Sequence, residues 1–173
     1  MAFYSGPDDD ISWAHATDKE FQSFTEENAG SGGALLFGRK TYEMMIRYWP
    51  TPQAAKENPI VAERMNSLPK FVFSRILSKA DWQNTNVLKG ELESEVRKLK
   101  EVSWSEIVIL GSGSIVTQLA SKRLIDRLQI VIFPIILGDG KQLFQGVSGK
   151  LGLKLASSRA FSNGVEVLNY EPA

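Results

Sequence analysis

The stretch Leu35-Leu36-Phe37-Gly38-Arg39-Lys40-Thr41 changes character at Gly38. Ahead of this glycine, residues 34–37 form a short unbroken apolar run, which is typical of a β-strand covered on both faces. After it, residues 39–48 predict a helix that ends before Pro50. The order of strand, glycine and helix predicts one unit of an α/β sheet.

The same construction returns in Ile109-Leu110-Gly111-Ser112-Gly113-Ser114-Ile115, where an apolar strand at 107–110 leads into a helix that ends at about Lys122. In a parallel sheet the carboxyl ends of the strands share one edge, and ligands bind there. A helix that begins at this edge offers unpaired backbone N–H groups to an anion such as phosphate. Each motif by itself favours a plain turn, because a glycine between a strand and a helix is common in such turns. In the second motif, Val116 also stands where the last glycine of the usual dinucleotide pattern would fall.

The rest of the chain alternates between the two kinds of element. Strands are predicted at 71–73, at 85–88 and over a long segment at 126–136, and helices at 18–28, 60–68 and 91–101. Near the C-terminus, Leu151, Leu153 and Leu155 alternate with other residues ahead of an Asn163-Gly164 turn, which predicts an antiparallel hairpin. The fold class is therefore α/β, with a mixed, mostly parallel sheet flanked by helices and a C-terminal hairpin.

Composition narrows the function. A chain of 173 residues fits a single domain, residues 1–173, and its 20 basic and 20 acidic side chains balance. The absence of cysteine and the lone His15 exclude disulfides and metal sites built from cysteine or several histidines. The longest apolar run, at 130–137, contains Pro134 and is too short to span a bilayer, and the N-terminus lacks the pattern of a signal peptide. We expect a cytoplasmic protein with no nucleic-acid or membrane partner.

Residues 36–43 (Leu-Phe-Gly-Arg-Lys-Thr-Tyr-Glu) closely resemble the segment of dihydrofolate reductases that runs from a strand into the cofactor-binding helix. Residues 73–75 (Phe-Ser-Arg) resemble the adenosine-contacting turn of that fold. Residues 111–115 resemble its pyrophosphate turn, with a serine in place of the usual middle glycine. The resemblance implies a dihydrofolate-reductase-like three-layer fold.

Two later segments point to a particular branch of this superfamily. Residues 133–140 with Leu143-Phe144, and the ending at 161–170, resemble the reductase domain of the bifunctional riboflavin-biosynthesis deaminase/reductase and its stand-alone bacterial relatives. The resemblance extends from about Gly6 to Pro172. It also places a central strand ahead of Phe3, where this chain has none, and residues 3–7 look like the end of the loop that follows that strand. We expect a misassigned start site or a truncation.

The resemblance implies NADPH as cofactor. Arg39, Ser74 and Arg75 would face its 2′-phosphate and adenosine, with Lys40 close by. Thr41 and the turn at 111–115 would hold the pyrophosphate. The full cofactor-binding set implied is Gly38, Arg39, Lys40, Thr41, Ser74, Arg75, Gly111, Ser112, Gly113, Ser114 and Ile115.

The substrate side is less well specified by the sequence. Trp13 is a candidate wall for a planar heterocycle, with core packing as the alternative. Dihydrofolate reductases carry an acid on the first helix, and Asp18 and Glu20 lie in that region, although neither is in register. We take Glu20 as a substrate-binding candidate, with a helix-start role as the alternative. No catalytic residue is identified.

The leading hypothesis is a bacterial NADPH-dependent reductase that transfers hydride to a small heterocyclic or carbonyl-like substrate. Reduction of 5-amino-6-(5-phosphoribosylamino)uracil is the best-known chemistry of the resembled family, and dihydrofolate reduction is the less favoured variant. The alternatives are a non-catalytic NADPH-binding protein and a dimeric scaffold. A homodimer is expected, because stand-alone relatives pair and because the hairpin and the long strand would supply an apolar face.

Overall fold

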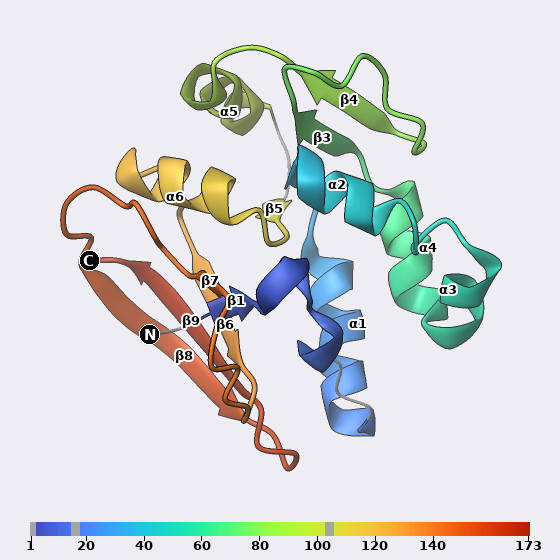
Figure 1. Cartoon of the computed structure of the whole chain (residues 1–173), viewed down its shortest axis with the longest axis vertical. Helices are drawn as coiled ribbons and strands as arrows, with labels where there is room; N and C mark the ends of the chain where they lie inside the picture. The colour runs from blue at the N-terminus through green and yellow to red at the C-terminus, as the bar shows by residue number, and fades with distance from the viewer. Residues whose placement is uncertain (1–2, 15–17, 103–105) are drawn as a thin grey trace. The chain divides into compact units, whose positions relative to one another are not determined.

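The computed structural model describes residues 3–14, 18–102 and 106–173 (Figure 1). These residues form two compact units: Phe24–Ile115, called here the parallel-sheet unit, and Met1–Ser23 with Val116–Ala173, called the hairpin unit. The prediction of a single domain stays a prediction. His15 falls outside the described residues.

The parallel-sheet unit contains a four-stranded sheet in the order β4-β3-β2-β5. Its strands are β2 (Ala34–Gly38), β3 (Lys70–Phe73), β4 (Thr85–Leu88) and β5 (Ile107–Ile109), and all three pairings are parallel. The central strand β2 is buried over four of its five residues, as its unbroken apolar run predicts. The register sets Gly38 opposite Phe73 and Leu36 opposite Ile109, so the carboxyl ends of β2, β3 and β5 share one edge.

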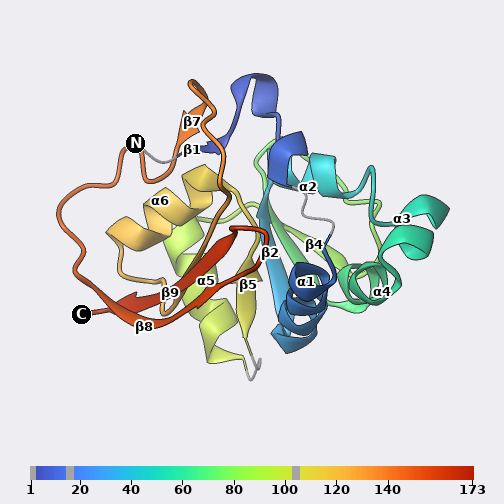
Figure 2. The ribbon, with the colours of Figure 1, turned by 90° about the horizontal axis from the view of Figure 1, so that it is seen from below.

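Among the described residues, the α-helices follow the predicted order with one addition. They are α1 (Lys19–Ser31), α2 (Arg39–Met45), α3 (Pro52–Glu57), α4 (Pro59–Ser67), α5 (Leu92–Glu101) and α6 (Gly113–Ser121). Figure 2 shows α4 and α5 on opposite sides of β2. The added helix is α3. Thr51 accepts a hydrogen bond from the Ala54 N–H and Pro52 occupies the first turn, which is a regular helix start.

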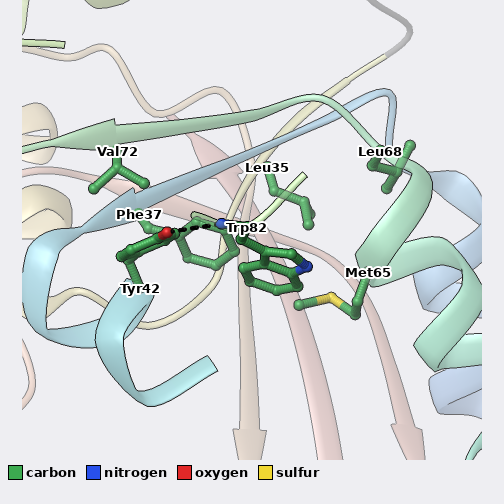
Figure 3. Packing of buried hydrophobic residues seen from close by; sticks show 7 residues of the cluster. All are labelled: Leu35, Phe37, Tyr42, Met65, Leu68, Val72 and Trp82. Carbon is green, nitrogen blue, oxygen red and sulfur yellow. Dashed lines mark hydrogen bonds between the residues drawn. The ribbon is translucent and has the colours of Figure 1, made fainter. Parts of the chain in front are cut away.

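One face of the parallel sheet packs against α2 and α4. The cluster contains Leu35, Phe37, Tyr42, Met65, Leu68, Val72 and Trp82 (Figure 3). The Trp82 ring stacks on Phe37 with ring centroids 6.1 Å apart, and the Trp82 backbone N–H donates to the Tyr42 hydroxyl at 3.2 Å. Trp49 packs against the same cluster, so it serves the core.

Lys70 is a charged residue on this face, and its burial was not predicted from the sequence. Its side chain is fully buried, and its ammonium lies 4.7 Å from the centre of the Trp82 ring. It donates to the backbone oxygens of Met65, Asn66 and Leu68 at 2.8, 3.0 and 2.7 Å. These oxygens lie at the C-terminal end of α4, where helix carbonyls lack backbone partners and a cation is favourable.

The hairpin unit holds an antiparallel sheet in the order β6-β9-β8, with β6 (Leu128–Ile132), β8 (Leu153–Ala160) and β9 (Glu166–Pro172). The predicted hairpin is confirmed, and Gly164 in its turn has a φ of +84°. The predicted strand at 126–136 is too long, because the chain turns at Phe133, whose carbonyl accepts from the Ile135 N–H. Pro134 lies inside this turn and has no N–H for a ladder.

Phe3–Ser5 differs from the prediction as well. Instead of a loop end it forms a short strand, β1, which pairs antiparallel with β7 (Lys141–Gln142). The prediction missed this pairing because its two halves lie more than 130 residues apart and neither carries a hairpin signal.

One face of the three-stranded sheet carries Val167, which is buried, although β8 is exposed along all eight of its residues. Alternation and register place a second set on the other face, and each of its members is half-buried or exposed. We call this set the apolar face: Leu128, Ile130, Ile132, Leu153, Leu155, Leu168 and Tyr170. The alternating leucines of the hairpin therefore do not enter the core, and Leu155 is 49% exposed.

None of the helices in the described parts of the chain combines the length and the apolar character that a bilayer crossing requires.

Candidate functional site

The first part of the site is the junction of β2 and α2. Gly38 ends the strand and precedes the helix with extended backbone angles, φ −79° and ψ 159°. A glycine supplies no capping side chain, so the N–H groups of the first helical turn, Arg39 to Thr41, are left to other acceptors. This arrangement suits an anion.

The second part is the turn after β5. Gly111 and Ser112 both have left-handed backbone angles, with φ of +62° and +57°. The Ile115 N–H then donates to the Ser112 carbonyl at 2.8 Å, at the beginning of α6. The turn therefore carries its chain directly from the strand end into a second helix start at the same sheet edge.

A hydroxyl group joins the two parts. Ser112 Oγ accepts a hydrogen bond from the Gly38 N–H at 2.7 Å and donates one to Thr41 Oγ1 at 2.9 Å. Gly38 favours this approach, because a Cβ there would lie 3.3 Å from Ser112 Oγ, which is closer than most Cβ contacts. We call the joined residues 38–41 and 111–115 the phosphate edge.

Positive charge is distributed unevenly beside this edge. Arg39 directs one nitrogen, Nη1, to both carboxylate oxygens of Glu43 at 2.7 and 2.8 Å. Lys40 and Arg75 are exposed and have no ion-pair partner within residues 3–14, 18–102 and 106–173. Arg39 is thus partly neutralised by Glu43, while Lys40 and Arg75 are exposed. Contact of these three residues with a ligand stays a prediction.

Ser74 shapes the turn that carries Arg75. Its buried hydroxyl accepts from the backbone N–H groups of Leu77 and Ile76 at 2.9 and 3.3 Å. The ladder extends to this residue, since the Ser74 N–H donates to the Leu88 carbonyl at 3.1 Å. The Ser74 hydroxyl keeps a proton that it can donate.

The two substrate candidates, Trp13 and Glu20, belong to the hairpin unit. Trp13 packs edge-on against Phe133, with ring centroids 5.7 Å apart, and its indole N–H donates to the Asp10 carbonyl. Glu20 accepts from Ser162 and pairs with Arg159 at 3.5 Å. The contacts of Trp13 match packing, its structural alternative, whereas those of Glu20 are made with the hairpin and do not show the helix-start role. Contact of either residue with a substrate stays a prediction.

Asp18 has a similar structural role at the start of α1. Its carboxylate accepts from the Phe21 N–H at 2.9 Å, which is an N-cap bond, and from the Asn163 side chain. It therefore ties the helix start to the hairpin turn.

The sequence reasoning missed two features of the site. The Arg39–Glu43 pair has the four-residue spacing at which helical side chains meet, so the signal was present. The bridge made by Ser112 had no such signal, because it joins residues 74 positions apart.

The order of the sheet and the paired strand–glycine–helix junctions define an α/β protein of the dihydrofolate-reductase-like class. Within that class the chain belongs to the RibD C-terminal domain family, which matches residues 3–167. It is 30% identical over 169 residues to the uncharacterized protein YyaP of Bacillus subtilis (strain 168), covering 97% of this chain and 87% of that one.

Solved structures share the fold. One, from Shewanella sp. PV-4, is described as a riboflavin biosynthesis protein; it has a TM-score of 0.75 at 21% identity and covers 99% of this chain and 92% of its own. A pyrimidine reductase-like protein from Corynebacterium diphtheriae has a TM-score of 0.60 at 17% identity, with 91% of this chain and 82% of that chain covered.

A third is the diaminohydroxyphosphoribosylaminopyrimidine deaminase/5-amino-6-(5-phosphoribosylamino)uracil reductase of Thermotoga maritima, with a TM-score of 0.66 at 15% identity. The match covers 99% of this chain and 53% of that enzyme, so the chain spans about half its length. Family membership and this shared architecture support a reductase-like role.

Proposed function

We propose that this protein is an NADPH-dependent reductase of a small heterocyclic or carbonyl-like substrate. The observation that carries the proposal is the hydroxyl of Ser112, which joins the β2–α2 junction to the turn after β5. The joined edge offers two helix starts to one ligand, and a dinucleotide with its linked phosphates is a ligand of that kind.

The residues at this edge fit the cofactor. Thr41 and the turn at 111–115 would hold the pyrophosphate through hydroxyl and backbone N–H groups. Lys40 and Arg75, with Arg39 and Ser74, would face the 2′-phosphate, because cations and a hydroxyl donor suit a dianionic phosphate. When bound, NADPH supplies a hydride; the protein's own groups bind and orient.

The names of two solved relatives support a choice of substrate class. The Thermotoga maritima enzyme is named for the reduction of a phosphoribosylaminouracil, and the Corynebacterium diphtheriae protein as pyrimidine reductase-like. A ribosylated aminopyrimidine is therefore the first acceptor to test. The alternative is a non-catalytic NADPH-binding protein or scaffold that keeps the same edge.

The test is a fluorescence titration with NADPH and with NADH on the wild type, Lys40→Ala and Arg75→Ala. Loss of a charge-assisted phosphate contact should weaken NADPH binding by roughly 1–3 kcal/mol in each variant and leave NADH within about twofold. Lys56→Ala is the matched control, because Lys56 is exposed on α3 of the same unit. A wild type that binds neither nucleotide would overturn the proposal, and binding without oxidation by any acceptor would favour the alternative.

We propose in addition that the protein is a homodimer that pairs through the apolar face. In a twofold dimer one patch meets its own copy, so a single apolar face is sufficient. Leu155→Lys should then convert a dimer into a monomer in light scattering at micromolar concentration. Lys154→Glu, on the opposite face of β8, should leave the dimer intact. A monomeric wild type would contradict this.

A further inference from the structure

We propose that Ser112 is a positioning residue whose hydroxyl fixes the two halves of the phosphate edge in one arrangement before a ligand binds. The inference rests on the proposed function and deepens it. The proposed function names the ligand, whereas this inference names the group that holds the two halves of the phosphate edge in place.

The backbone at Ser112 is the first observation. Its φ of +57° lies in the left-handed region, which disfavours side chains by roughly 1–2 kcal/mol and which glycine adopts freely. A serine here therefore carries a penalty that a glycine would avoid. Strain of this kind persists where the surrounding structure demands it, and it clusters at functional sites.

The bonds of the hydroxyl are the second observation. Ser112 is 9% exposed, and its only hydroxyl proton goes to Thr41 Oγ1, while its oxygen accepts from the Gly38 N–H. Gly38 directly precedes α2 and Thr41 lies in its first turn. The serine thus forms hydrogen bonds at both ends of the helical turn whose N–H groups would bind the pyrophosphate.

The directions of these two hydrogen bonds decide which hydroxyl can still donate a proton. Thr41 Oγ1 receives a proton from Ser112, so the proton of Thr41 itself remains for another acceptor. In a chain of hydroxyls each donor polarises the next, which strengthens the terminal donor. The chain Ser112 to Thr41 therefore ends in a hydroxyl prepared for an anion.

The rival explanation is a purely structural one, in which the hydroxyl only satisfies the Gly38 N–H. The two explanations differ in what a glycine would do. Ser112→Gly removes the backbone strain together with the hydroxyl, so these effects on stability oppose each other. Ser112→Ala keeps the strain and loses the hydroxyl, so it should be the less stable of the two.

The experiment measures NADPH and NADH affinity and thermal unfolding for the wild type, Ser112→Gly, Thr41→Val and the double variant. We expect Ser112→Gly to unfold within a few degrees of the wild type yet to bind both nucleotides at least fivefold more weakly, by the same factor, because they share the pyrophosphate. Thr41→Val should behave likewise, and the double variant should lose little more, because the two residues act in one chain. Thr41→Ser keeps the hydroxyl and should stay within twofold of the wild type.

A second readout does not need the nucleotide. Hydrogen exchange of the Gly38 amide should accelerate at least tenfold in Ser112→Gly, because its acceptor is gone. A wild type that binds neither nucleotide overturns the proposed function. Nucleotide affinity within twofold in Ser112→Gly, or an unchanged exchange rate at Gly38, overturns the positioning role while the cofactor site remains.

Discussion

Replacing Lys70 with methionine tests the charge buried beneath the parallel sheet. Burial lowers the pKa of Lys70 from 10.5 to about 8. The native protein therefore releases this proton before the unfolded chain does. Between pH 8 and 10.5 the unfolded chain binds more protons, so this group makes the free energy of unfolding rise with pH across that window.

The size of the effect follows from the two pKa values. A fall from 10.5 to about 8 corresponds to about 3 kcal/mol, and the three carbonyl oxygens that hold the ammonium make this an upper bound. At pH 7 the variant leaves the oxygens of Met65 and Leu68 without the ammonium, which costs about 1–3 kcal/mol for each. Relief of the buried charge offsets part of this loss. We expect a net destabilisation of about 1–2 kcal/mol at pH 7.

Urea unfolding of the wild type and Lys70→Met at pH 7, 8, 9 and 10 measures the difference. The advantage of the wild type should grow as pH rises, and Lys56→Met, at an exposed position, should show no such trend. A difference that stays flat from pH 7 to 10 would refute the argument, because it would mean that the buried lysine keeps an ordinary pKa.

Three further predictions concern a turn, a helix start and the phosphate edge. Gly140→Ala should destabilise the protein by more than about 3 kcal/mol in thermal unfolding, because a Cβ there would meet the carbonyl of Ser5 and φ is +148°. The control in the same series is Gly30→Ala on α1, where a Cβ meets no atom; this variant should be neutral or stabilising by about 0.5–1 kcal/mol. Asp18→Ala should lose about 1–2 kcal/mol with its N-cap bond, and equal stability of the two proteins would show that the cap is dispensable. Glu43→Gln should increase the affinity for NADPH roughly three- to tenfold and leave the affinity for NADH unchanged, because it removes a negative charge near the 2′-phosphate. Weaker NADPH binding would show instead that Glu43 helps by holding Arg39 in place.

The sequence predicted β2, β3 and β5 well because each contains a continuous apolar run, whereas β4 begins with two polar residues and has a weaker pattern. The apolar runs of β2 and β3 are typical of strands that helices cover on both faces. The helix starts after Gly38 and at Gly113 followed from the same pattern. The α3 start was overlooked although Thr51-Pro52 carries its signal, an N-cap followed by a proline in the first turn.

The misses share a physical cause, which is that they depend on partners distant in the chain. Lys70 looks like the polar first residue of a strand, and the carbonyls at the C-terminal end of α4, together with the Trp82 ring, make its burial tolerable. The alternation of Leu153 and Leu155 predicted the hairpin, but alternation does not say which face of a sheet is covered. The register sets Leu155 opposite Tyr170, on the face away from Val167.

The hydrogen bond between Gly38 and Ser112 also bears on how the chain is made. The two residues are 74 positions apart, and ribosomes add roughly 5–20 residues per second, so β2 waits on the order of 4–15 seconds for its neighbour β5. During this interval the backbone groups on the β5 side of β2 have no strand partner. Until β5 has been made, this edge of β2 carries unpaired backbone groups to which an edge strand of another chain can bind, and the exposure ends when β5 pairs with it.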